Sequence, residues 1–136
     1  MLIEHIAIYT NDLERLKAYY VQFFGAVPNE KYRNNQTGFE SYFLSFDSGA
    51  RMEIMQKPDI PGNQNDTIQK QHLGLIHFAI ALKSKAAVDS KAKELQLAGY
   101  TILRGPRTTG DGYYEFETLD PDNNRLEVTA LRQNPA

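Results

Sequence analysis

The chain contains no cysteine among its 136 residues. Disulfide bonds, thiolate nucleophiles and thiolate metal ligands are therefore excluded, and any bound metal must be held by nitrogen and oxygen atoms. Neither sign of charge dominates, because 15 lysine and arginine residues stand against 17 aspartate and glutamate residues, and the net charge is −2. No basic run is available to neutralise phosphates, which argues against a nucleic-acid partner.

Long apolar runs are also missing from the sequence. No segment approaches the roughly 20 apolar residues that a membrane-spanning helix needs. The first apolar segment carries Glu4 and His5 and has no basic region before it, unlike a secretory signal peptide. We therefore expect a cytoplasmic protein without a membrane partner, long enough for one domain or for two small fused modules.

One pattern occurs twice in the sequence. Residues 3–25 and 75–99 both begin with an alternating strand that contains His-x-Ala, and both continue into an amphipathic helix that ends at a glycine. Each helix is followed by strand-like segments and by a hairpin whose last strand contains Arg-x-Glu. The pattern predicts an α+β fold of two tandem βαβββ modules: module one at 1–56, a polar linker at 57–73 and module two at 74–132.

The two expected helices have matching ends. Asp12 and Ser84 are the predicted N-caps, and Gly25 and Gly99 supply the predicted stops. Between these ends, apolar residues recur at helical spacing and predict the buried stripes. The stripes are Leu13, Leu16, Tyr20 and Phe23 in the first helix and Val88, Ala92 and Leu95 in the second.

The pleating of the strands predicts that the repeated histidines and glutamates lie on the faces away from the most apolar side of each strand. Side chains alternate along a strand, so His5 points with Ala7 and Tyr9, and His77 points with two alanines. The glutamate of each Arg-x-Glu likewise lies opposite the most apolar side of its strand. Small alanines beside both histidines leave room for something bulkier than a protein side chain.

Each of these residues also has an ordinary structural explanation. A single histidine in a half-buried strand is more often a hydrogen-bonded structural residue, and a single exposed glutamate is usually just solvated. Repetition changes this balance, because two carboxylates buried together are costly unless a cation neutralises them. If the copies pair by approximate two-fold symmetry, we predict a divalent-metal site with open positions for water or substrate. Its ligands would be His5, Glu53, His77 and Glu127.

The segment 104–115 holds three glycines, two arginines and adjacent tyrosines before a strand. One interpretation is a loop at the cavity mouth, in which Arg107, Tyr113 or Tyr114 contacts an anionic substrate. The other is a plain glycine-rich hairpin connection. Tyr9 is a further candidate substrate contact, or else a core tyrosine.

The whole pattern resembles the vicinal oxygen chelate superfamily, which includes glyoxalase I, bleomycin-resistance proteins and extradiol dioxygenases. The segments that carry the resemblance are HIAIYTNDLERLKAYYVQFFG, ARMEIM, LIHFAIAL and PRTTGDGYYEFETLDPDNNRLEVT. The resemblance implies paired modules that curve into a half-open barrel around a metal. It also implies that His5, Glu53, His77 and Glu127 correspond to the ligands of bacterial glyoxalase I, which metal-free bleomycin-binding relatives lack.

Glyoxalase I isomerises the hemithioacetal that a 2-oxoaldehyde forms with a thiol. The resemblance therefore implies a metal-dependent lyase or isomerase that acts through an enediolate, with Glu127 as first candidate for the base and Glu53 as its counterpart. Nickel or zinc is the expected metal, with manganese, cobalt and iron as alternatives. The alternative functions are antibiotic binding or resistance, and another metal chemistry such as an epimerase or extradiol dioxygenase. We expect a homodimer, because a second chain could cover the strand edges and the open cleft.

Overall fold

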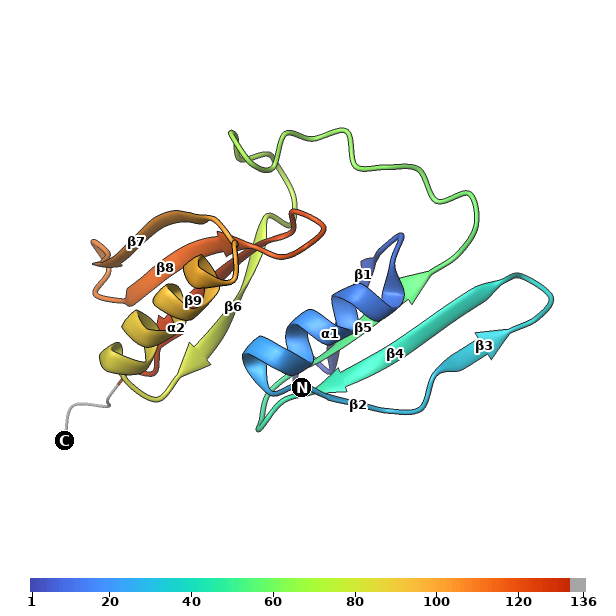
Figure 1. Ribbon diagram of the computed structural model, residues 1–136, viewed down its shortest axis with the longest axis horizontal. Helices are drawn as coiled ribbons and strands as arrows, with labels where there is room; N and C mark the ends of the chain where they lie inside the picture. Colours follow the sequence, from blue (N-terminus) through green and yellow to red (C-terminus); the bar gives the residue numbers. More distant parts are fainter. Residues whose placement is uncertain (133–136) are drawn as a thin grey trace. The chain divides into compact units, whose positions relative to one another are not determined.

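The computed structural model describes residues 1–132 (Figure 1). The chain divides between Gln64 and Asn65 into two compact units, here called unit one and unit two. This division falls within the predicted linker at 57–73, which contains no helix or strand. In the described part of the chain, no helix is both long and apolar enough to cross a membrane.

Unit one contains one helix and a mixed sheet. Strand β1 runs parallel to β5, and β5, β4 and β2 follow in antiparallel order, while β3 also pairs with β4. The elements are β1 (His5–Tyr9), α1 (Leu13–Phe24), β2 (Val27–Pro28), β3 (Tyr32–Asn34), β4 (Phe39–Ser45) and β5 (Arg51–Gln56).

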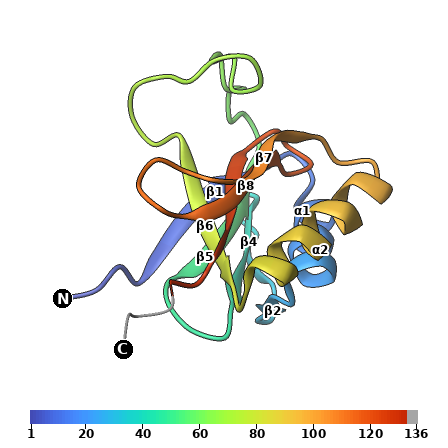
Figure 2. The same ribbon diagram turned by 90° about the vertical axis from the view of Figure 1, so that its left-hand side faces the viewer.

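Unit two repeats this topology with one strand fewer. Strand β6 runs parallel to β9, and β8 and β7 continue the sheet in antiparallel order. Helix α2 packs along one face of this sheet (Figure 2). The elements are β6 (His77–Leu82), α2 (Lys85–Leu97), β7 (Ile102–Thr108), β8 (Tyr114–Leu119) and β9 (Arg125–Ala130). The predicted α+β fold of two modules is confirmed, with the βαβββ order intact in unit two.

The edge strand differs between the two units. In unit one it is split into β2 and β3, and in unit two β7 is continuous but shifts register twice against β8. Proline has no N–H to donate to a sheet, so edge positions and irregular pairings tolerate it best. Pro28 and Pro106 both lie in these edge strands.

The helix ends lie where the sequence predicts them. The side chain of Asp12 accepts a hydrogen bond from the Arg15 N–H at 3.0 Å, and Gly25 ends α1 with a positive φ of 64°. In unit two, Ser84 Oγ accepts from the Ala87 N–H at 3.1 Å, and Gly99 follows α2 with a φ of 92°. The predicted stripes are buried, and Tyr19 joins the stripe of α1.

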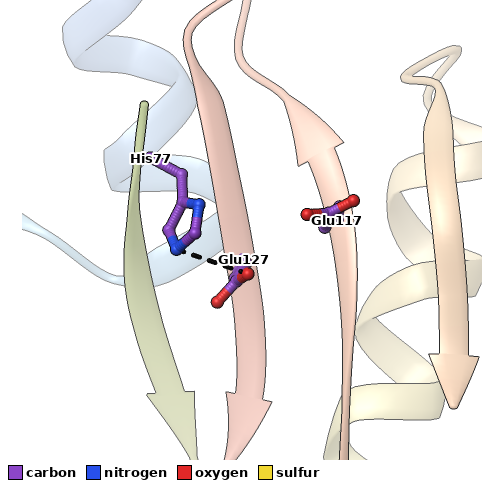
Figure 3. Close-up of side chains that lie close together, drawn as sticks. All are labelled: His77, Glu117 and Glu127. Carbon is purple, nitrogen blue, oxygen red and sulfur yellow. Dashed lines mark ion pairs between the residues drawn. The ribbon is translucent and has the colours of Figure 1, made fainter. Parts of the chain in front are cut away.

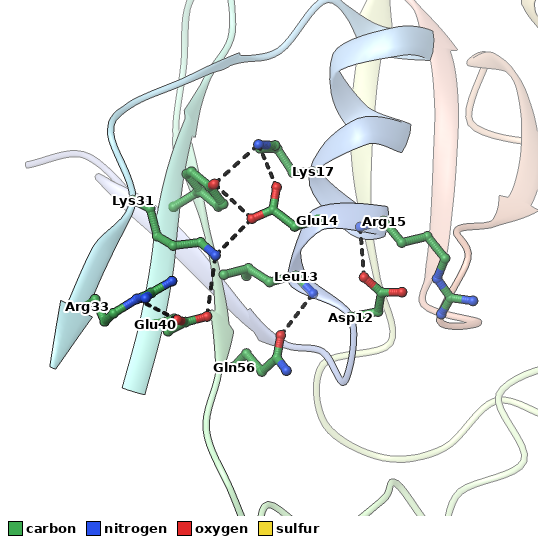
Figure 4. Close-up of polar contacts among 10 residues, drawn as sticks. Asp12, Leu13, Glu14, Arg15, Lys17, Lys31, Arg33, Glu40 and Gln56 are labelled. Atoms are coloured by element: carbon green, nitrogen blue, oxygen red, sulfur yellow. Dashed lines mark hydrogen bonds and ion pairs between the residues drawn. The ribbon is translucent and has the colours of Figure 1, made fainter. Parts of the chain in front are cut away.

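A charged cluster connects the first turn of α1 to its sheet (Figure 4). The Glu14 carboxylate lies 2.7 Å from Lys17 Nζ and 2.9 Å from Lys31 Nζ, and it accepts a hydrogen bond from Tyr42 Oη at 2.9 Å. The hydrogen bonds from Lys17 and then from Lys31 lower the pKa of Glu14 from its ordinary value of 4.5 to about 2. The folded state therefore favours the ionised form of Glu14.

We expect Glu14→Gln to lower the free energy of unfolding at pH 7 by about 1 kcal/mol at most, because the cluster is half exposed and solvent screens it. The folded-state pKa is depressed, so this contribution is present above pH 4.5 and is lost as the pH falls towards 2. Urea unfolding of both proteins at several pH values measures the difference. The exposed Glu30 provides a control, Glu30→Gln. A Glu14 difference that stays constant across this pH range would contradict the assignment.

Candidate metal centre

In unit two, His77 and Glu127 lie on neighbouring parallel strands. Ala79 on β6 pairs with Glu127 on β9, and His77 shares the face of Ala79, two residues earlier. The two side chains therefore meet diagonally, and His77 Nε2 is 3.3 Å from Glu127 Oε1 (Figure 3). The residues that flank Glu127 in β9, Leu126 and Val128, are fully buried, so Glu127 points to the face away from the core.

Unit one contains the same diagonal pair at the same register. Ala7 on β1 pairs with Glu53 on β5, and His5 Nε2 lies 3.8 Å from Glu53 Oε2. The other ring nitrogen of His5, Nδ1, contacts the Glu4 carboxylate. The hydrogen bonds of Glu4 with His5 and then with Arg51 hold the pKa of Glu4 below its usual value. A carboxylate on the second nitrogen fixes the orientation of an imidazole ligand.

A further acidic residue joins the pair in unit two. Glu117 on β8 lies directly opposite Glu127 in the antiparallel ladder. Only 8% of the surface of Glu117 is exposed to solvent. His77, Glu117 and Glu127 each offer one ligand atom, and these atoms all lie within 4.8 Å of one another (Figure 3). Glu117 was not predicted from the sequence. The alternation in YEFETL was the available signal, because it places Glu117 on the face opposite Phe116 and Thr118.

Glu115 extends this acidic face along β8. It pairs with Thr129, two residue pairs along the ladder from the Glu117–Glu127 pair and on the same face. Burial, followed by the charge of the neighbouring Glu127 carboxylate and a hydrogen bond with it, raises the pKa of Glu115. Partly desolvated carboxylates this close together are costly when ionised, and a bound cation would offset that cost.

The other predicted contact residues are more scattered. Arg107 belongs to the edge strand β7, where it pairs with Glu115, and is not part of a loop. The β7–β8 connection is shorter than predicted, since residues 104–108 are a strand with proline and glycine in its middle. Tyr9 lies on the face of His5 and is exposed at the far end of β1.

Tyr113 lies at the opposite end of the unit-two sheet from His77. It precedes β8, which runs antiparallel to β9, so it neighbours the last residues of β9. The Arg132 guanidinium lies over its ring at 4.1 Å. A cavity of about 700 Å³ is found there, and Tyr113 is among the residues that line it. The structure therefore separates Tyr113 from the His77–Glu127 pair.

The donors of unit two fit a divalent metal. They are one imidazole and two carboxylates without sulfur, a set that suits a hard or borderline cation. Two of their polar atoms, His77 Nδ1 and Glu117 Oε2, are buried and have no hydrogen-bond partner among the described residues. Buried polar atoms are normally hydrogen-bonded, so these two retain capacity to bind a cation, although Arg104 Nε lies 3.2 Å from Glu117 Oε2 as an ion pair.

The fold is that of a known family of proteins. Residues 2–128 match the Glyoxalase/Bleomycin resistance protein/Dioxygenase superfamily, and the chain belongs to this superfamily. The resemblance stated from the sequence is confirmed. Proteins of this superfamily generally use a divalent metal and bind small-molecule substrates.

Individual relatives agree with this assignment. The chain is 32% identical over 129 residues to the Bacillus subtilis protein named "Uncharacterized protein YwkD", covering 93% of this chain and 94% of that protein. A glyoxylase/bleomycin resistance protein/dioxygenase domain from Frankia sp. EAN1pec has a TM-score of 0.77 at 17% identity, covering 96% of this chain and 97% of that one. Glyoxalase I of Leishmania major has a TM-score of 0.73 at 17% identity, covering 96% of this chain and 86% of that one. At these identities the two structures show the shared fold.

Proposed function

We propose that this protein is a cytoplasmic, metal-dependent enzyme of the glyoxalase I type, which isomerises the hemithioacetal of a 2-oxoaldehyde and a thiol. The observation that carries the proposal is the diagonal His–Glu pair, repeated at the same strand register in both units. Structural likeness to a trypanothione-dependent glyoxalase I supports the reaction class, and leaves open which thiol this chain accepts.

In this proposal His5, Glu53, His77 and Glu127 hold one divalent cation, nickel or zinc first and manganese, cobalt or iron as alternatives. When bound, the cation supplies Lewis-acid stabilisation of the negative charge that develops on the substrate oxygens. Glu127 removes the proton from the hydroxyl-bearing carbon of the hemithioacetal and returns it to the neighbouring carbon. The working form is a homodimer with a small-molecule substrate.

The test combines metal binding with a substrate screen. Isothermal titration of the metal-free protein with each of the five metals should give near-stoichiometric binding at one site per pair of units. The loaded protein should then convert methylglyoxal hemithioacetals, offered with several thiols, into thioesters. The double variant His5→Ala/His77→Ala should bind no metal and form no thioester. A folded protein that binds none of these metals would remove the proposal.

A further inference from the structure

The two units differ in the residue that stands opposite the glutamate of the repeated His–Glu pair. In unit one, the residue opposite Glu53 on the neighbouring strand is Phe43, and in unit two the residue opposite Glu127 is Glu117. The Phe43 ring packs edge-on against the His5 ring, with centroids 5.3 Å apart. The His–Glu pair of unit one therefore has an apolar flank, while the pair of unit two has an additional carboxylate beside it.

Glu117 is buried without a full set of partners. Its Oε2 atom lies 3.2 Å from Arg104 Nε and 3.7 Å from Arg125 Nη1, yet it accepts no hydrogen bond from any described residue. The Arg125 guanidinium instead donates through Nη2 to the Thr67 carbonyl at 2.8 Å. Both arginines form ion pairs with Glu117, but neither donates a hydrogen bond to Oε2. A buried carboxylate oxygen with no hydrogen-bond donor is costly.

We propose that Glu117 is a third cation-holding side chain of unit two, together with His77 and Glu127. The inference rests on the metal dependence proposed above and adds a ligand to it. Donors bonded to one metal at about 2.0–2.2 Å are separated by at most about 4.4 Å, so atoms within 4.8 Å need only small side-chain adjustments. Unit two then offers three donors, one more than its His–Glu pair alone.

This arrangement also bears on the proton transfer. A carboxylate that both holds a cation and acts as a base must leave the cation in order to take a proton. Glu117 lies directly opposite Glu127 on the next strand, so it would still offer a carboxylate to the cation when Glu127 acts as the base. Unit one has no such substitute, because Phe43 stands in that place.

The experiment measures the zinc affinity of the full chain by competition with a chromophoric chelator. We expect Glu117→Gln to weaken zinc binding at least about tenfold, as the loss of a group that supports a metal site does. Glu94→Gln on α2 removes the same charge from an exposed position of the same unit and should leave the affinity unchanged. Visible absorption of the cobalt-loaded protein gives a second readout, because the spectrum of cobalt changes when a ligand is lost.

Glu117→Asp keeps the charge but shortens the side chain, and it serves as the second variant if the glutamine variant fails to fold. It should also alter the cobalt spectrum. If His77→Ala loses zinc while both Glu117 variants match the wild type in affinity and spectrum, the inference is overturned and the proposed function stands. Weaker zinc binding in Glu117→Gln with unchanged cobalt spectra would show a charge effect alone and would also overturn it. If the wild type binds no metal, both proposals fail.

Discussion

Replacing Glu127 with glutamine is expected to lower kcat/KM for a hemithioacetal about a thousandfold. The substitution keeps the shape of the side chain but removes the group that takes the proton in the proposed reaction. General bases typically contribute rate factors of about 10² to 10⁴. The fold should persist, since Glu127 lies on the face of β9 opposite the core residues Leu126 and Val128. Steady-state kinetics at saturating metal, with metal content measured on each sample, separates loss of the base from loss of the cation.

Glu53→Gln is the matched comparison, because Glu53 occupies the equivalent register position in unit one. We expect a smaller loss of activity for it, since its distance to the histidine is 3.8 Å rather than 3.3 Å and no second carboxylate stands opposite it. A reversed order, with the greater loss in Glu53→Gln, would assign the base to unit one. Full activity in both variants would exclude Glu127 and Glu53 as the base.

Local features of this fold could be read from the sequence with little loss. The caps at Asp12 and Ser84 and the stops at Gly25 and Gly99 depend on residues within one or two turns, so short-range chemistry decides them. The faces of the strands follow equally directly, because alternation along a strand is a property of its own residues. The internal repeat then reinforced each of these predictions, since both copies had to agree.

Glu117 was not predicted because its place in the site depends on residues that are distant in the sequence. Alternation gives the face of Glu117 but not its opposite neighbour, which depends on the register between β8 and β9 across the turn at 120–124. A slip of one residue in such a register would turn every side chain to the other face. The internal repeat does not indicate Glu117 either, because the equivalent position in unit one is Phe43 and the repeat indicates only residues that both copies share.

The assignment of Arg107 to a loop failed for a related reason. Glycine and proline at 105 and 106 are typical of turns, and that local signal predicted a break. Pairing with β8 overrides it, since an edge strand accepts proline where its missing N–H would face away from the sheet. As a result, the pairing between β7 and β8 contains two register shifts, which a sequence pattern does not reveal.

Phe116→Ala is expected to lower the free energy of unfolding by about 3–5 kcal/mol, a larger loss than that expected for Glu14→Gln. Phe116 is 1% exposed and lies in β8, on the face that packs against α2, so truncation leaves a cavity that its neighbours fill only in part. Urea unfolding followed by circular dichroism measures the loss. Leu97→Ala is the control, because Leu97 ends α2 with 90% of its surface exposed and its truncation should change stability by no more than about 0.5 kcal/mol.

The same substitution tests whether the core of unit two supports its candidate metal centre. Phe116 and Glu117 are adjacent in β8 and point to opposite faces, so the packing of Phe116 under α2 holds the strand that presents Glu117. Folded Phe116→Ala protein should therefore bind zinc more weakly than the wild type, whereas Leu97→Ala should bind it equally well. Wild-type zinc affinity in a Phe116→Ala protein that has lost several kcal/mol of stability would show that Glu117 is held by the β8–β9 ladder alone, without support from the core.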